Sequence, residues 1–215
     1  MNSELFFESA SDERGTPQAF FDKLNEEFHF DVDVAASQDN AKCETYFGPG
    51  GVAEDALEAD WGGLTCFLNP PYSVAGAFVK KAREEADLGA VVVMLLPVRS
   101  DTKWWHGYVW DKEAKRLSGS VGAWRPGVQC RFIPGRLSFE LKVSEKMRAL
   151  INDERHKGLA QGDRYDEKTL IKALVEQTGL PKMAIMGIWE SKPDEDLLSG
   201  APFPSCVVIF RKVQS

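Results

Sequence analysis

The segment LTCFLNPPYSVAGAFVKKAREEADLGAVVVMLL, residues 64–96, decides the fold class. Residues 64–68 predict a buried strand that ends directly at an Asn-Pro-Pro-Tyr turn. A helix is expected from Ser73 or its neighbour through Ala86, and the apolar run 90–96 predicts a strand covered on both faces. A strand, a helix and a strand joined this closely form a βαβ unit. The segment therefore predicts an open parallel sheet with helices on both faces.

The residues before this unit predict one more helix and one more strand. Apolar side chains recur at helical spacing in residues 17–28, with Thr16 as a candidate N-cap and Pro17 at the first helical position. Residues 29–36 alternate apolar and polar side chains and end in small residues, which is typical of a short strand.

The C-terminal half predicts fewer sheet elements. Its expected elements are a hairpin of residues 129–133 and 137–141 about Pro134-Gly135-Arg136, amphipathic helices at 142–157 and 166–178, a polar loop at 193–204 and a last strand at 206–210. The whole pattern predicts an α/β fold with a Rossmann-like, doubly wound mixed sheet. We expect a single domain over 1–215 with a helical insertion at about 142–200.

Composition fits a folded protein of 215 residues, with a formal net charge of −7 that is unevenly distributed. Residues 1–61 carry a local charge of −12, whereas residues 99–136 carry +5 and include Trp104, Trp105 and Trp124. This basic stretch is either a strip for a phosphate backbone with stacking aromatic rings, or a solvated face whose tryptophans belong to the core.

Cysteine usage and hydropathy exclude some classes of protein. The four cysteines are far apart in the sequence, which disfavours both a disulfide framework and a structural zinc site, and we expect no metal. Because no apolar run approaches a membrane span and no signal peptide is apparent, we expect a cytoplasmic protein without a membrane partner. A monomer is slightly favoured.

The turn Asn69-Pro70-Pro71-Tyr72 is the motif most indicative of chemistry. It follows a buried strand, and ligands of doubly wound sheets bind beyond the carboxyl ends of the strands. The Asn69 amide oxygen and the Pro70 carbonyl could accept the two hydrogens of an NH₂ group, while Tyr72 offers a flat face for a base. Such a grip orients the nitrogen lone pair toward an electrophile and suits methylation of an amino group. The alternative is a turn with no chemical role.

Acidic residues near the N-terminus are candidates for binding the electrophile. Asp31 and Asp33 precede Ala35 and Ala36, whose small side chains let a cofactor approach the backbone. Asp55 and the pair Asp60-Trp61 could bind or pack an adenine ring. Because the chain has neither GxGxxG nor a P-loop, the acidic half fits a cationic cofactor such as S-adenosylmethionine better than a polyphosphate. Each single Asp could instead be a solvated or capping carboxylate.

These motifs together resemble the phage-type DNA N6-adenine methyltransferase family, the Dam-like enzymes of bacteriophages and prophages. The matching pieces occur in family order and span nearly the whole chain: TPQAFFDKLNEEFHFDVDVAAS (16–37), NAKCETYF (40–47), EDALEADWGG (54–63), FLNPPYS (67–73), VVVMLLPVRSDTKWWH (91–106), CRFIPGRLSFE (130–140) and APFPSCVVIF (201–210). The sequence departs from the usual methyltransferase pattern in one place, where DVDVAAS replaces a glycine-rich loop.

The resemblance implies methyl transfer from S-adenosylmethionine to N6 of a flipped-out adenine in double-stranded DNA. It also implies the fold of the class I S-adenosylmethionine-dependent methyltransferases. If the protein is phage-encoded, the implied location is the host cytoplasm. The implied residues that hold the adenine are Asn69, Pro70, Pro71 and Tyr72. The candidates on the cofactor side are Thr16, Pro17, Asp33, Ala35, Asp55 and Asn69. The candidates for DNA contact are Arg99, Ser100, Lys103 and Trp104, in a loop that also includes Asp101 and Thr102, together with Arg131 and Arg136.

Two other functions remain open at the level of sequence. The same amino-methyl transfer could act on RNA or on a protein glutamine, because the Asn-Pro-Pro-Tyr motif occurs in those enzymes too. A catalytically silent module that binds DNA or cofactor is the third interpretation.

Overall fold

The computed structural model describes residues 14–115, 121–141, 143, 145–160, 166–178, 180, 182–190, 198–200 and 204–213. The chain forms two compact units. The first, here called the sheet unit, contains Gln18–Leu137 and Ala201–Ser215, and the second unit contains Phe7–Pro17 and Ser138–Gly200. In the described residues, no helix is both long and apolar enough to cross a membrane.

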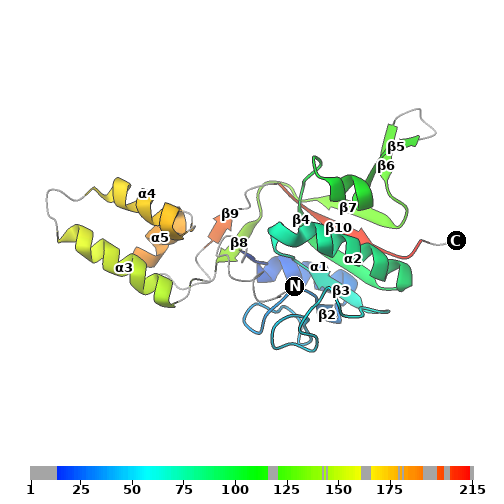
Figure 1. Cartoon of the computed structure of the whole chain (residues 1–215), viewed down its shortest axis with the longest axis horizontal. Helices are drawn as coiled ribbons and strands as arrows, with labels where there is room; N and C mark the ends of the chain where they lie inside the picture. The colour runs from blue at the N-terminus through cyan, green and yellow to red at the C-terminus, as the bar shows by residue number, and fades with distance from the viewer. Residues whose placement is uncertain are drawn as a thin grey trace. The chain divides into compact units, whose positions relative to one another are not determined.

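A five-stranded mixed sheet is the centre of the sheet unit (Figure 1). Its strands, in spatial order, are β2 (Val32–Asp33), β3 (Thr65–Leu68), β4 (Val91–Pro97), β10 (Ser205–Phe210) and β7 (Val128–Phe132). The first three strands are parallel, and β10 runs antiparallel to both of its neighbours. The predicted α/β class is therefore confirmed, with a sheet that is parallel on one side only.

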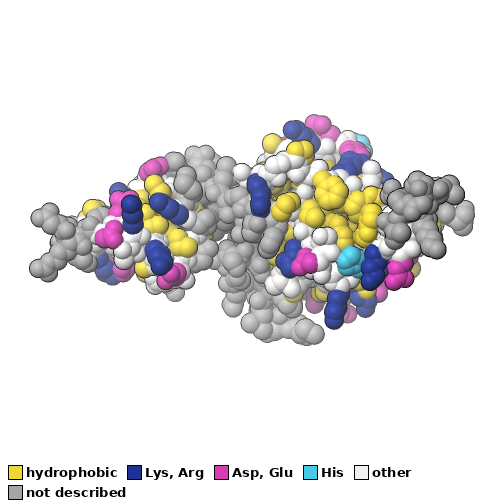
Figure 2. All heavy atoms as spheres, turned by 90° about the horizontal axis from the view of Figure 1, so that it is seen from above, with side chains coloured by type: hydrophobic (Ala, Val, Ile, Leu, Met, Phe, Trp, Pro, Cys, Tyr) yellow, Lys and Arg dark blue, Asp and Glu magenta, His cyan; other side chains and the backbone are white. Residues whose placement is uncertain are grey.

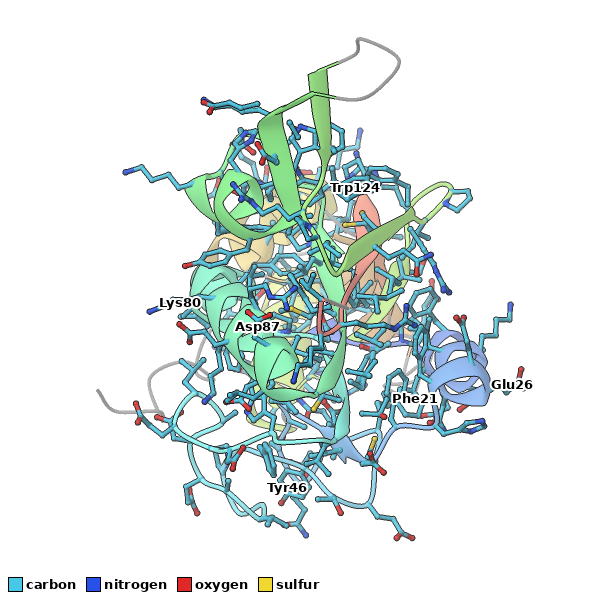
Figure 3. The ribbon with its side chains drawn as sticks, turned by 90° about the vertical axis from the view of Figure 1, so that its right-hand side faces the viewer. Phe21, Glu26, Tyr46, Lys80, Asp87 and Trp124 are labelled. Carbon is cyan, nitrogen blue, oxygen red and sulfur yellow. The ribbon has the colours of Figure 1, made fainter. Side chains whose placement is uncertain are left out.

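Two helices cover opposite faces of this sheet: α1 (Gln18–Phe28) and α2 (Ala75–Leu88) (Figure 3). Successive strand residues point to opposite faces, so each strand contributes to two cores. The core on the α1 side contains Phe21, Leu24, Phe67, Val93, Val207 and Ile209. The core on the α2 side includes Leu68, Phe78, Val79, Ala82, Met94 and Val208. The prediction of helices on both faces is confirmed.

Local boundaries differ from the sequence expectation at three places. The corner after β3 continues into a 3₁₀ turn, Tyr72–Val74, and α2 begins at Ala75 with Val74 as its N-cap, so Ser73 does not cap the helix. Helix α1 begins at Gln18, one residue after Pro17. The strand predicted over 29–36 contracts to Val32–Asp33, because the backbone beyond it pairs with the loop at Phe47.

The predicted hairpin of residues 129–133 and 137–141 is wrong. Strand β7 pairs with β10, whereas β8 (Ser138–Leu141) belongs to a separate sheet with β1 (Arg14–Gly15) and β9 (Leu198–Gly200). All six residues of β10 are buried, so this strand needs a partner on each side and takes β7 as the second. Gly135, with φ +75°, occupies the turn that separates β7 from β8.

Three helices form the second unit beside that small sheet: α3 (Glu145–Leu159), α4 (Glu167–Thr178) and α5 (Lys182–Trp189). The first two confirm the predicted helices, and α5 was not predicted. Their common core includes Ile151, Leu174, Leu180, Ile185 and Ile188. The predicted loop 193–204 lies largely outside the described residues, and where residues 198–200 are described the prediction is wrong, because they pair with β8 as strand β9.

The sheet unit also contains a β-hairpin that was not predicted. Strands β5 (Trp110–Lys115) and β6 (Val121–Trp124) pair with each other after a π-helix, η3 (Trp105–Val109). Trp105 is buried, which confirms the core interpretation for that tryptophan, and Trp104 and Trp124 are half-buried against the same core.

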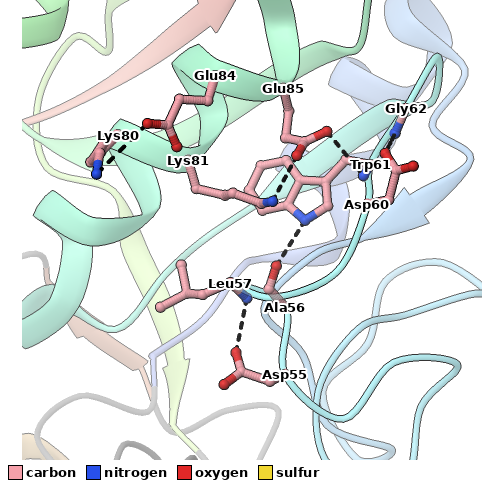
Figure 4. A network of polar contacts seen from close by, with 10 residues as sticks. All are labelled: Asp55, Ala56, Leu57, Asp60, Trp61, Gly62, Lys80, Lys81, Glu84 and Glu85. Atoms are coloured by element: carbon pink, nitrogen blue, oxygen red, sulfur yellow. Dashed lines mark hydrogen bonds and ion pairs between the residues drawn. The ribbon is translucent and has the colours of Figure 1, made fainter. Parts of the chain in front are cut away.

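A buried acidic side chain ties α2 to the segment that precedes β3 (Figure 4). Glu85 is almost fully buried; its carboxylate accepts the backbone N–H of Trp61 at 3.1 Å and pairs with Lys81 at 2.7 Å. The Trp61 indole has no exposed surface and donates from Nε1 to the Ala56 carbonyl at 2.8 Å. These bonds position the chain that leads into β3.

Replacing Glu85 should therefore destabilise the sheet unit. We expect Glu85→Ala to lower the free energy of unfolding by about 2–4 kcal/mol, because it leaves the Trp61 N–H and the Lys81 ammonium without their acceptor. The matched control is Glu84→Ala in the same helix, where the exposed pair with Lys80 at 3.7 Å contributes less than about 0.5 kcal/mol. Urea unfolding followed by circular dichroism measures both, and equal effects would contradict the role of Glu85.

Candidate active site

The Asn-Pro-Pro-Tyr corner lies at the carboxyl edge of the parallel strands. Strand β3 pairs with β2 through Phe67 and Asp33, and with β4 through Leu68 and Met94. Asn69 follows Leu68 directly, so it leaves the sheet between the ends of its two neighbours. This is the position at which doubly wound sheets bind ligands.

The corner is rigid and reaches the solvent. Pro70 and Pro71 are buried, Asn69 and Tyr72 are half-buried, and Ser73 is exposed. The Pro71 carbonyl accepts the backbone N–H of Val74 at 3.2 Å, whereas no residue in the described part of the chain donates to the Pro70 carbonyl. Asn69, the Pro70 carbonyl and Tyr72 thus lie together at this corner, and their grip on an NH₂ group stays a prediction from the sequence.

Asp33 and Ala35 lie beside this corner, at the end of β2. The Val34 N–H donates to the Phe67 carbonyl at 2.9 Å, which places the two chain segments next to each other. The Asp33 carboxylate is buried and accepts the Lys42 backbone N–H at 3.0 Å. Burial raises the pKa of Asp33 to about 7, and the Lys42 N–H opposes this shift only in part. Ala35 remains half-buried.

The other acidic candidates have local structural roles. Asp55 accepts the Leu57 N–H at 2.9 Å and so stabilises the turn that follows it, while remaining half-buried. Asp60 accepts the Gly62 N–H at 2.8 Å, and Asp31 accepts the Thr65 N–H at 2.8 Å. Because Trp61 is fully buried, the idea that its ring packs against a bound adenine is wrong.

Thr16 and Pro17 belong to the second unit, so their contact with a cofactor stays a prediction. Thr16 is buried and Pro17 is half-buried. No group of three His, Cys, Asp or Glu side chains in the described ranges is arranged to hold a metal ion.

The basic stretch divides into exposed and internally bonded residues. Ser100 and Lys103 are exposed, and Arg99 pairs with Asp101 at 3.3 Å. The Trp104 indole lies against Gly76 in the first turn of α2. Residues 99–104 thus follow β4 and end against the first turn of α2, and their place beside a target base stays a prediction.

Arg131 and Arg136 lie at and beyond β7. Arg131 forms a bidentate ion pair with Glu27, at 2.6 and 2.7 Å. Its guanidinium also lies over the Phe28 ring, so it is bonded within the protein. Arg136 is exposed. The face of the sheet unit seen in Figure 2 carries hydrophobic side chains bordered by Lys and Arg together with Asp, Glu and His. Phe132, 58% exposed and near the Trp124 ring, is a large apolar side chain open to solvent.

An open groove of about 430 Å³ lies at the opposite edge of the sheet. It is lined by residues at the start of β7, the end of β10 and the chain that follows β10. Since Phe210 pairs with Val92 near the start of β4, this groove is far along the strands from Asn69 and is separate from the corner.

The raised pKa of Asp33 predicts a pH-dependent stability. The folded protein binds the Asp33 proton more tightly than the unfolded chain does, so this stabilising contribution is lost as pH rises from 3.8 toward about 7. Asp33→Asn removes the titration and retains an acceptor for Lys42. We expect the variant to gain stability relative to wild type across this interval, by at most ~1.4 kcal/mol per pH unit, with no further gain above about pH 8. Urea unfolding across pH measures this, and parallel curves would contradict it.

Comparison with known proteins identifies the family. The family model described as DNA N-6-adenine-methyltransferase (Dam) matches residues 5–162. The chain is 41% identical over 76 residues to a DNA N-6-adenine-methyltransferase of Haemophilus phage HP1, covering 35% of this chain and 42% of that protein. It is 38% identical over 76 residues to the enzyme of the same name from Escherichia phage T1, covering 35% and 31%.

The similarity spans less than half the length of these curated relatives. The family match includes β2, β3, β4 and the Asn-Pro-Pro-Tyr corner, and it ends before the motif at 201–210. Because the match covers well over half of the chain, this protein belongs to the DNA N-6-adenine-methyltransferase (Dam) family.

Proposed function

We propose that this protein transfers a methyl group from S-adenosylmethionine to N6 of an adenine in double-stranded DNA. The observation that carries the proposal is the position of the Asn-Pro-Pro-Tyr corner at the carboxyl edge of a parallel strand, with Asn69 and Tyr72 half-buried there. Family membership and the names of the two phage relatives support adenine as the target base and DNA as the substrate.

The corner binds the amine through two acceptors. The Asn69 amide oxygen and the Pro70 carbonyl accept the two N6 hydrogens, and this draws the nitrogen lone pair out of conjugation with the ring. Tyr72 stacks on the adenine, which must leave the duplex to reach the corner. Because the lone pair attacks before a proton is lost, no strong base is needed at Asn69.

The residues beside the corner fit a cationic cofactor. Asp33 supplies a carboxyl group at the end of β2, and the small side chain of Ala35 leaves room for close approach to the backbone. We assign cofactor binding to these two residues, to Asp55 and to Asn69, whereas the role of Thr16 and Pro17 stays a prediction from the sequence. S-adenosylmethionine supplies an electrophilic methyl group when bound.

We further propose that the sheet unit is a Rossmann-like fold of the class I methyltransferases. The parallel strands β2, β3 and β4, with one helix on each face and the corner at their carboxyl edge, support this assignment. The contacts of Arg99, Ser100, Lys103, Trp104, Arg131 and Arg136 with DNA are part of the same proposal.

The proposal is tested by incubating the protein with labelled S-adenosylmethionine and unmodified DNA, RNA or protein in parallel, followed by base-resolution mapping. We expect label on adenine N6 of double-stranded DNA. For Asn69→Ala we expect at least a ~100-fold loss of turnover, well beyond any loss of cofactor affinity, because an acceptor for the amine is gone. Asn69→Asp keeps an acceptor oxygen and should retain measurable turnover. Near-normal turnover of Asn69→Ala would refute the grip.

Tyr72 allows a separate test of base stacking. Tyr72→Ala should weaken DNA binding by about 1–3 kcal/mol, roughly a 5- to 150-fold rise in KM for DNA, because the base loses its aromatic platform. Tyr72→Phe keeps the ring and serves as the matched control. If both variants raise KM equally, the phenol hydroxyl rather than stacking is responsible.

A further inference from the structure

The loop of residues 98–104, here called the post-β4 loop, lies beside the Asn-Pro-Pro-Tyr corner. The Val98 N–H donates to the Pro204 carbonyl at 2.7 Å, which fixes the start of the loop. At its other end, the Trp104 Cδ1 lies 3.1 Å from the position that a Cβ on Gly76 would occupy. Gly76 is in the first turn of α2, which begins directly after the corner. The loop therefore starts at the end of β4 and ends against the helix that follows the corner.

A turn within the loop fixes one of its carbonyls. Thr102 donates to the Arg99 carbonyl from Oγ1 at 2.7 Å and from its backbone N–H at 3.0 Å. The Trp105 N–H in turn donates to Thr102 Oγ1 at 3.4 Å. Ser100 is inside this turn, but its carbonyl is bonded from the π-helix.

His106 makes that bond. Its Nε2 lies 2.8 Å from the Ser100 carbonyl oxygen, and because a carbonyl only accepts, Nε2 is the donor. Its other ring nitrogen, Nδ1, is buried and has no hydrogen-bond partner among the described residues. The ring thus has one polar attachment, and that attachment is the post-β4 loop.

The backbone of His106 is held from the opposite side. Arg125, in the turn between β6 and β7, donates to the His106 carbonyl from Nε at 3.1 Å and from Nη2 at 2.7 Å. The Arg125 N–H also donates to the Val109 carbonyl at 3.0 Å. A continuous set of bonds therefore runs from the β6–β7 turn through His106 to Ser100.

Packing alone does not explain a histidine at this position. A buried ring nitrogen without a partner is unfavourable, and an apolar aromatic ring would avoid that penalty. What the histidine adds is the Nε2 donor. We propose that His106 is a positioning residue for DNA methylation: through Ser100 it fixes the post-β4 loop beside the Asn-Pro-Pro-Tyr corner. This inference rests on the proposed function, and His106 itself touches neither substrate nor cofactor.

Three variants of His106 separate the effect of its Nε2 hydrogen-bond donor from the effect of its side-chain volume. His106→Phe keeps a planar ring and removes the donor; His106→Gln places an amide N–H near the position of Nε2; His106→Asn carries a shorter amide that does not reach Ser100. Each is compared with wild type by kcat/KM for DNA, cofactor affinity by calorimetry, thermal unfolding and hydrogen exchange of the peptide containing residues 98–104.

We expect His106→Phe and His106→Asn to lose about 5- to 10-fold in kcat/KM for DNA, the effect of one lost hydrogen bond, and to exchange faster in the post-β4 loop. Cofactor affinity should stay close to that of wild type, and His106→Gln should recover most of the activity. If His106→Phe does not fold, His106→Asn against His106→Gln gives the same comparison.

Full activity with unchanged exchange in both His106→Phe and His106→Asn would overturn the proposal. A folded His106→Gln variant as impaired as His106→Phe would also overturn it, because the donor would then be irrelevant. A wild-type protein that methylates no DNA would refute the proposed function instead, and hydrogen exchange would still decide whether His106 holds the loop.

Discussion

The parallel register of β3 between β2 and β4 is the constraint on which the candidate site depends. Phe67 points to the α1 core and Leu68 to the α2 core, so a slip of one residue would place each side chain on the wrong face. The register thus fixes where Asn69 leaves the sheet. Pro70 and Pro71 have no N–H to continue a ladder, and the chain must turn there. The burial of Phe67 and Leu68 in this way positions the polar side chain of Asn69, which is itself only half-buried.

The distribution of charge matters more than its sum in this acidic protein. Of the basic residues in 99–136, Arg125 binds the His106 carbonyl and Arg131 binds Glu27, so both serve the fold. Exposed basic side chains described in this stretch include Lys103, Lys112 and Arg136. Net charge alone therefore does not tell which basic side chains of this stretch are on the surface and which stabilise the fold.

Helices and strands that are specified by their own hydrophobic pattern were predictable from the sequence. Strand pairings that depend on a choice between two possible partner strands were not. The apolar run ending at Leu96 and the periodic residues of α1 and α2 each specify one structure. Strand β7 does not, because residues 137–141 and β10 are both plausible partners; the complete burial of β10 decides the outcome. The same limit applies at the site. The corner could be recognised by its Asn-Pro-Pro-Tyr motif. His106 and Arg125 donate hydrogen bonds to backbone carbonyls, and such bonds produce no recognisable pattern of residue types in the sequence.

The path of the chain also explains how the second unit can interrupt the sheet. The Ile133 N–H donates to the Ser205 carbonyl at 3.0 Å, so the chain leaves β7 and enters β10 at hydrogen-bonded neighbours. A chain segment whose two ends are hydrogen-bonded in this way is equivalent to a long hairpin loop. The entropic cost of closing such a loop rises only weakly with its length. That residues 142–200, which fall within the second unit, are a helical insertion in a single domain stays our proposal. On this interpretation β10, which lies beyond the family match, is still required, because it fills the sheet between β4 and β7 and thereby supports the edge that carries Asn69.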